Sequence, residues 1–160
     1  MEESKMHLIN KLFNNETIRT IWDKEQEKYY VSVVDVVGVL SGSENPRKYW
    51  NKLKQRLKEE GNQTVTNCHQ LKLQADDGKM RKTDVADIKT IFRIIQSVPS
   101  KKAEPIKQWL AKVGQERVQE MAEPSTAIYR ARETYKKLGR SEKWIQNIMT
   151  GQETRNKLTD

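Results

Sequence analysis

The sequence predicts an α+β fold in which small β-hairpins pack with helices and an all-helical extension follows. Two pairs of β-prone segments, each joined by turn residues, predict hairpins within residues 18–32 and 70–82. Residues 101–150 instead carry apolar side chains at helical spacing throughout. A chain of 160 residues is long enough for one domain with a helical appendage. We place the domain at residues 13–118 and the extension at residues 119–160.

The first hairpin consists of Ile18–Trp22 and Tyr29–Ser32, with the charged turn Asp23–Lys28 between them. The next segment, Val33–Leu40, is ambiguous because its valines favour a strand whereas their spacing is helical. A serine just before it and an aspartate three residues later resemble a capping box. This pair favours the helix, although the strand stays open as the alternative.

The segment Pro46–Lys58 is basic and aromatic and contains no acid. Asn45 supplies an N-cap and Pro46 a preset first turn, so we expect a helix to begin here. At 100° per residue its side chains divide into an apolar stripe and a basic row on the opposite side. The apolar stripe consists of Tyr49, Trp50, Leu53 and Leu57. The exposed row consists of Arg47, Asn51, Lys54 and Lys58, flanked by Lys48, Lys52 and Gln55.

Such a row of cations and amides could neutralise phosphates and reach base edges. A solvated outer face is the plain alternative, but the row has no compensating acid along its own segment. The formal net charge of +8 and the pI near 9.5 favour a polyanionic partner, in the first place nucleic acid. Two helices joined by a short turn, residues 33–40 and 46–58, also resemble a helix-turn-helix whose second helix is the recognition helix.

Residues 59–67 are expected to form a polar loop, and the second hairpin, residues 70–82, turns at Asp76–Lys79. A helix over residues 83–97 follows, capped by its first or second residue and ended by the proline at position 99. Its apolar positions are Val85, Ile88, Ile91, Phe92 and Ile95.

The remaining chain predicts three helices, over residues 101–121, 124–138 and 141–150, the second of which ends at a glycine. Trp109 has helical spacing with the apolar Ile106 and Val113, which indicates a core position. The first of these helices opens with two lysines, against the preference of the helix dipole for acids. This placement suggests that Lys101 and Lys102 contact an external anion.

No group of residues predicts an enzyme, a metal site or a cofactor. The densest acids occupy positions that turns and first helical turns ordinarily give them. They are Asp76, Asp77, Asp84 and Asp87. Cys68 and His69 lack a second ligand pair at the spacing of a zinc site. No nucleophile elbow, phosphate-binding loop or dinucleotide-binding glycine motif occurs.

A single cysteine offers no disulfide framework and fits a reducing compartment. No apolar run approaches the ~20 residues that span a bilayer, and the first ten residues lack the apolar core of a secretory signal. We expect a cytoplasmic protein without membrane contact.

Several segments together resemble the N-terminal domain of the BRO family, found in prophage antirepressors and in proteins of large DNA viruses. The segments that carry this resemblance are Tyr30–Leu40, Asn45-Pro46, Ile91–Ser97, Ala103–Leu110 and Val113. The likeness covers roughly residues 13–118. It implies a mixed α+β DNA-binding domain with a regulatory role in phage or stress biology.

A further likeness is to the family of bacterial DNA-damage-inducible protein D. It lies in Val98–Pro105, Trp109–Gly114, Tyr135–Ile145 and Arg155–Thr159. Proteins of this kind normally continue beyond the last of these segments. The resemblance therefore implies that the present chain is an N-terminal fragment.

The combined prediction is a DNA-binding regulator of prophage antirepressor type. The residues expected to contact DNA are Arg47, Lys48, Asn51, Lys52, Lys54, Gln55, Lys58, Lys101 and Lys102. The alternative is a protein-interaction module whose basic faces meet a repressor or another acidic protein of DNA repair or recombination. A homodimer is compatible with either, since DNA readers often match two half-sites. Replacing Lys54 and Lys58 by Glu is expected to abolish DNA binding without unfolding the domain.

Overall fold

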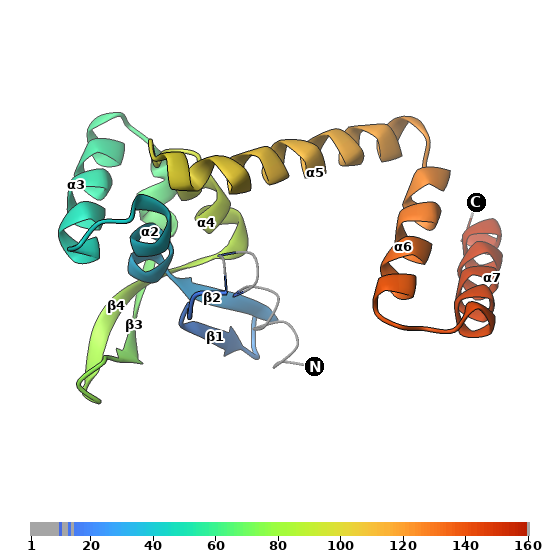
Figure 1. Cartoon of the computed structure of the whole chain (residues 1–160), viewed down its shortest axis with the longest axis horizontal. Coiled ribbons are helices and arrows are strands. Elements are labelled where there is room, and N and C mark those ends of the chain that lie inside the picture. Colours follow the sequence, from blue (N-terminus) through green and yellow to red (C-terminus); the bar gives the residue numbers. More distant parts are fainter. Residues whose placement is uncertain (1–9, 11–12, 14, 160) are drawn as a thin grey trace. The chain divides into compact units, whose positions relative to one another are not determined.

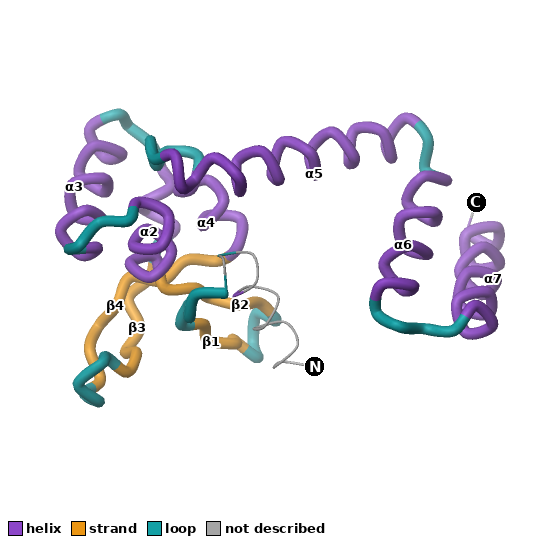
Figure 2. The backbone as a smooth tube through the Cα atoms, in the orientation of Figure 1, coloured by secondary structure: helices purple, strands orange, loops and turns teal. Residues whose placement is uncertain are grey.

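The computed structural model describes residues 10, 13 and 15–159, with side chains as far as residue 151. The chain forms two compact units, the first ending at Trp109 and the second beginning at Leu110. All the described strands lie in the first unit (Figure 1). The predicted α+β class with a helical extension is confirmed, and Figure 2 shows that helices and short connections alone follow the last strand. The division that we place between residues 118 and 119 stays a prediction.

The first unit is built on a four-stranded antiparallel sheet with the strand order β1-β2-β4-β3. The strands are β1 (Thr20–Asp23), β2 (Lys28–Ser32), β3 (His69–Gln74) and β4 (Met80–Asp87). Both predicted hairpins are present, as β1–β2 and β3–β4. In Figure 1 the turn end of the β3–β4 hairpin extends away from the helices.

The helix predicted from residue 83 begins later than expected, and this prediction is wrong at its N-terminal end. Strand β4 continues to Asp87, and helix α4 (Ile88–Ile95) starts only there. The Asp87 side chain caps α4 by accepting a hydrogen bond from the backbone of Thr90 at 2.9 Å. Val85 has the apolar spacing of a helix, but β4 is an inner strand that pairs with β2 on one side and β3 on the other. Pairing on both sides outweighs the local pattern.

Residues 33–41 are helical, which confirms the interpretation that the capping residues favoured. Helix α2 (Val33–Ser41) follows β2 without a loop, and the Ser32 hydroxyl accepts a hydrogen bond from the backbone of Asp35. It ends at Gly42, whose φ of 67° is left-handed and suits glycine.

Helix α3 (Pro46–Glu59) is also confirmed, and it begins where the sequence predicts. The Asn45 side chain accepts a hydrogen bond from the backbone of Lys48 at 3.1 Å. Figure 1 shows α2, α3 and α4 on the same side of the sheet. The core between these helices and the sheet contains Val31, Val33, Val36, Val37, Leu40, Trp50, Leu57, Ala86, Ile91, Ile94 and Ile95, all at most 1% exposed.

The segment after α3 contradicts its prediction as a polar loop. Residues Gln63–Asn67 form a 3₁₀ helix in which Thr64 and Val65 are buried. The Asn62 side chain caps this turn by accepting a hydrogen bond from the backbone of Thr64 at 2.8 Å. Burial of Thr64 and Val65 therefore holds this otherwise polar segment against the core.

The segment from Lys101 to Ala122 also differs from the single helix predicted there. Lys101–Ala103 form a short 3₁₀ turn, and helix α5 (Glu104–Ala122) starts after it with an acid in its first turn. The two lysines therefore lie in the turn before α5 and not in its first turn. Of the described α5 residues only Ile106 is buried, whereas Trp109 is 40% exposed with its ring edge against Phe92. The prediction of a core position for Trp109 is wrong.

The second unit contains the end of α5 and two further helices, α6 (Ser125–Lys137) and α7 (Glu142–Thr159). The predicted glycine stop of α6 is confirmed, because Gly139 has a φ of 81°. Tyr135 and Trp144 place their rings edge to face with centroids 5.0 Å apart, and Ile145 is buried. These apolar contacts join α6 to α7.

Candidate nucleic-acid interface

Helix α3 lies on the core through the apolar stripe that the sequence predicts. Trp50, Leu53 and Leu57 are at most 4% exposed, and Tyr49 is half-buried. The opposite side is exposed. It carries Arg47, Lys48, Asn51, Lys52, Gln55 and Lys58. A helix held on its apolar side therefore presents cations and amides to solvent.

Lys54 departs from the predicted row, because it is half-buried in an ion pair. Its Nζ lies 3.1 Å from Oδ2 of Asp84 on β4, and the side chains are 27% and 11% exposed. The same carboxylate accepts a hydrogen bond from Nε1 of Trp50 at 2.7 Å and one from Gln70 at 3.2 Å. No acid lies along the segment of the row itself, as the sequence indicates, but Asp84 on β4 compensates Lys54 from a distant part of the chain. Asp84 lies thirty residues further along the chain, so local sequence could not indicate it.

Asp84 is ionised within this cluster over most of the pH range. Burial alone raises the pKa of its carboxyl, but hydrogen bonds from Trp50, Lys54 and Gln70 and the charge of Lys54 outweigh burial. The pKa of Asp84 therefore lies below its usual value. Asp84 holds α3 on the sheet by accepting hydrogen bonds from the indole N–H of Trp50 and the ammonium group of Lys54.

We expect the stability of the domain to fall as the pH drops below about 4, since Asp84 has a lower pKa folded than unfolded. A depressed carboxyl pKa contributes stability above the unfolded pKa and loses it as the pH falls through the folded pKa. Urea unfolding at pH 7, 4 and 3 measures this. Asp84→Asn should be less stable than wild type at pH 7, and the difference should shrink towards pH 3. A constant difference would contradict the assignment.

The Asp84 contact also orients the rest of the row. Arg47, Asn51 and Lys58 are seven, three and four residues from Lys54 and so share its flank of the helix. Since Lys54 is bound to β4, this flank is the one next to the β3–β4 hairpin. Lys48 and Lys52 extend the basic surface around the outer side.

The cations of this surface have few internal partners. Within the part of the chain that the structure describes, no ion pair involves Arg47, Lys48, Lys52 or Lys58, all of which are exposed. Arg56, outside the predicted row, does have partners, because it donates to the backbone oxygen of Ser97 at 2.7 Å. Four unpaired cations on one fixed helix form a surface suited to phosphate groups.

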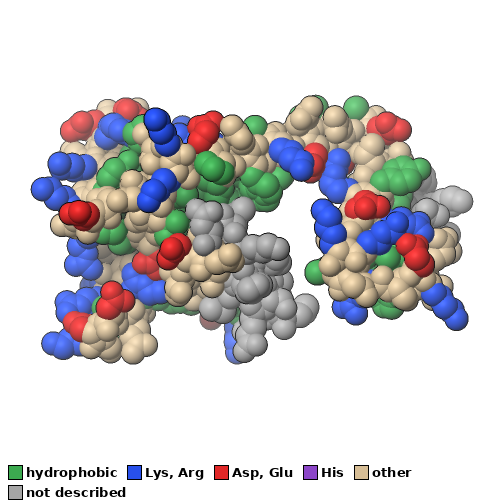
Figure 3. All heavy atoms as spheres, in the orientation of Figure 1, with side chains coloured by type: hydrophobic (Ala, Val, Ile, Leu, Met, Phe, Trp, Pro, Cys, Tyr) green, Lys and Arg blue, Asp and Glu red, His purple; other side chains and the backbone are tan. Residues whose placement is uncertain are grey.

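A cleft of about 440 Å³ separates the start of α3 from the β3–β4 hairpin. Its lining includes Arg47 from the helix and Arg81 from β4, with Asp76 from the hairpin turn. Figure 3 shows Lys and Arg side chains along the edge of the molecule that runs from α3 to this hairpin. The basic surface of α3 and the hairpin are therefore neighbours.

The structure places Lys101 and Lys102 in the 3₁₀ turn before α5 and not on α3. Lys102 lies beside the turn between α2 and α3, where a Cβ added to Gly42 would be 2.9 Å from its Nζ. With Gly42 and Pro46 it lines a second cleft of about 660 Å³. A larger residue at position 42 would displace this lysine.

Acids and the cysteine take ordinary structural roles. Asp77 accepts hydrogen bonds from the backbone of Lys79 and from Arg81 in the hairpin turn, as the sequence predicts. Burial raises the pKa of the Cys68 thiol to about 11, so it stays protonated near neutral pH. No cluster of three or more potential metal ligands occurs among the described residues. Asp84 is on a strand instead of in the predicted first turn of a helix.

Every helix in the described part of the chain is too short or too polar to cross a lipid bilayer.

The chain is similar to a known protein family. The family model described as "BRO family, N-terminal domain" matches residues 17–118, more than half of the chain. Neither the curated proteins nor the solved structures contain a match. The matched span includes the sheet, α2, α3 and α4 and ends within α5. The chain therefore belongs to the BRO family, of which it carries the N-terminal domain.

Proposed function

We propose that the protein is a regulator of prophage antirepressor type that binds duplex DNA through α3. The observation that carries this proposal is the unpaired cationic surface of a helix whose opposite side is held in the core. The BRO N-terminal domain is a DNA-binding regulatory domain, and this membership supports the same role. The net charge of +8 also favours a polyanion.

In this proposal the exposed side chains of α3 divide by chemistry. Arg47, Lys48, Lys52 and Lys58 contact phosphates, because they are charged, exposed and unpaired in the described structure. Asn51 and Gln55 lie among them, and their amides are suited to base edges. Gln55 donates to Glu59 in the free protein at 3.2 Å and would exchange this bond for a base.

Lys54 takes a different part in the proposal. Its charge is compensated by Asp84, so it positions α3 and contributes less to DNA affinity than its exposed neighbours. Lys54→Glu would place two carboxylates side by side and disturb the fold. The Lys54→Glu and Lys58→Glu pair is therefore unsuitable as a test of DNA binding. An anion contact by Lys101 and Lys102 stays a prediction.

The test is a titration of duplex DNA by fluorescence anisotropy with the Arg47→Gln and Lys58→Gln double variant. Removing two phosphate contacts should weaken binding about 10- to 100-fold at 0.1 M salt and reduce the slope of log K against log salt by about 1.8. The control is Lys24→Gln with Lys89→Gln, which removes two exposed lysines from the β1–β2 turn and from α4. The proposal would be refuted if the α3 double variant and the control double variant lowered DNA affinity equally. It would also be refuted if the wild type bound no DNA at low salt.

A protein-interaction module is the second candidate function, and the exposed apolar residues of α5 favour it. Trp109 and Val113 are 40% and 39% exposed, and Met121 is 71% exposed. A repressor or an acidic protein of the DNA-damage response would be the partner, in keeping with the likeness to DNA-damage-inducible protein D. DNA selection followed by sequencing separates the two candidates. An enriched motif supports a regulator that reads DNA sequence, whereas an acidic partner that competes with DNA at moderate salt supports the module.

A further inference from the structure

The β3–β4 hairpin carries two lysines that face each other across the strands. Lys72 and Lys82 are directly paired in the antiparallel register, so their side chains lie on the same face of the hairpin. Both are exposed, and neither forms an ion pair within the described part of the chain. Like charges at directly opposite positions destabilise a strand pair. The free protein therefore has an unfavourable contact here that an anion would relieve.

The acids closest to this pair along the strands are already engaged. Asp84, two residues after Lys82, binds Trp50 and Lys54. Asp77, in the hairpin turn, pairs with Arg81 at 2.6 Å. Both carboxylates are engaged elsewhere, and Asp76, the remaining acid of the hairpin turn, forms no ion pair with either lysine in the described part of the chain. The lysine pair is therefore uncompensated in the described structure.

The lysine pair lies on the same face of the hairpin as α3. Side chains two residues apart in a strand share a face, so Lys82 points to the same side as Asp84. Asp84 uses that side to bind α3 through Trp50 and Lys54. The Cα atoms of Lys82 and Asp84 are separated by roughly 7 Å, the length of two strand residues. The lysine pair therefore lies two strand residues from the Asp84 contact, on the face of the hairpin that binds α3.

We propose that Lys72 and Lys82 bind the phosphate backbone of the same DNA duplex that α3 contacts. This inference rests on the proposed function of α3 and adds a second binding element to it. A duplex presents a continuous line of phosphates, which can meet Arg47 and Lys58 on the helix and the lysine pair on the hairpin together. Phosphate contacts of this kind set the orientation of the protein on DNA and carry no base information themselves.

The experiment compares wild type with the Lys72→Gln and Lys82→Gln double variant in the anisotropy titration over a range of salt concentrations. Loss of two phosphate contacts should lower the salt slope by about 1.8 and the affinity at least ~10-fold at 0.1 M salt. The Lys24→Gln and Lys89→Gln control removes the same charge and should change both quantities much less. The melting temperature of the free hairpin variant should equal or exceed that of wild type, since a repulsive pair is removed.

A second variant, Lys82→Glu, separates loss of DNA contacts from loss of folding. It converts the repulsive lysine pair into an attractive Lys–Glu pair, so it should not unfold the hairpin. It should melt no lower than wild type and bind DNA more weakly than wild type does. If wild type binds DNA but both hairpin variants bind like the control, the hairpin inference is overturned and the role of α3 stands. If wild type binds no duplex at low salt, the proposed function fails and the inference fails with it.

Discussion

Trp50→Ala is expected to lower the free energy of unfolding by about 3–5 kcal/mol, the cost of truncating a large buried aromatic residue. Trp50 is 1% exposed and is the largest fully buried side chain among the described residues. Its indole ring fills the space under α3, and its N–H donates to Asp84 at 2.7 Å. The loss is a large part of the 5–15 kcal/mol by which domains are stable. Urea unfolding followed by circular dichroism measures it without relying on tryptophan fluorescence.

Trp50→Phe separates burial from the hydrogen bond. Phenylalanine keeps most of the buried ring but cannot donate to Asp84, so a loss of about 1–2 kcal/mol is expected. Were Trp50→Phe as costly as Trp50→Ala, the contact with Asp84 would matter more than the packing of the ring. Because the exposed side of α3 is positioned by this residue, the Ala variant should also bind DNA more weakly.

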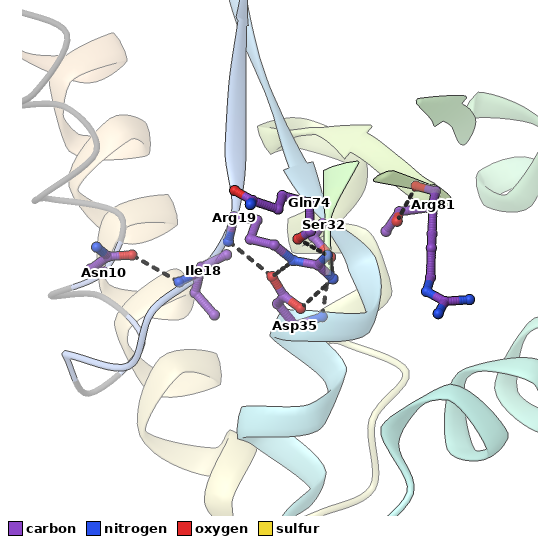
Figure 4. A network of polar contacts seen from close by, with 8 residues as sticks. Asn10, Ile18, Arg19, Ser32, Asp35, Gln74 and Arg81 are labelled. Atoms are coloured by element: carbon purple, nitrogen blue, oxygen red, sulfur yellow. Dashed lines mark hydrogen bonds and ion pairs between the residues drawn. The ribbon is translucent and has the colours of Figure 1, made fainter. Parts of the chain in front are cut away.

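Asp35→Ala is expected to cost about 2–4 kcal/mol, because it leaves a half-buried guanidinium without its acid. Asp35 accepts three hydrogen bonds from Arg19, from the backbone nitrogen at 2.9 Å, from Nε at 2.8 Å and from Nη2 at 2.9 Å (Figure 4). Arg19 also donates to the backbone oxygen of Gln74 at 3.1 Å. One arginine thus links the segment before β1, helix α2 and the end of β3.

The chain offers a matched control for this variant. Asp77 forms a salt bridge with Arg81 at 2.6 Å, but the two side chains are 46% and 49% exposed. Asp35 and Arg19 are 17% and 31% exposed. Since exposed ion pairs contribute little, Asp77→Ala should cost no more than about 1 kcal/mol. Equal losses in the two variants, measured by urea unfolding, would show that the Arg19 network does not join the three segments as proposed.

Helix starts are the features that local sequence predicts best in this protein. Ser32 and Asn45 cap α2 and α3 by bonds to residues three positions ahead, and such bonds need no distant partner. The glycine at position 139 ends α6 for a similar reason, because its φ of 81° is a property of its own backbone. The hairpins were predictable as well, since each depends on a turn and on the alternation beside it.

The misplaced start of α4 shows where local patterns fail. Positions 85 to 95 have the apolar spacing of one helix, but the first of them belongs to the sheet. Val85 pairs with Ser32 and His69 at once, and these partners are distant in sequence. No property of residues 83–87 alone distinguishes an inner strand from the first turn of a helix.

The fold class, the basic surface of α3 and the apolar stripe opposite it follow from residue order, because periodicity and capping are local. Which cations of that surface are unpaired depends on how distant segments pack. In the sequence nothing distinguishes Lys54 from the other lysines of the row, or Asp84 from the other acids. The packing of α3 on β4 brings the charged groups of these two residues to 3.1 Å from each other. The same packing turns towards α3 the face of the hairpin that carries Asp84, which by strand alternation is also the face of Lys72 and Lys82. The physical reason is that a contact between distant segments depends on how strands and helices pack, which local residue preferences do not encode.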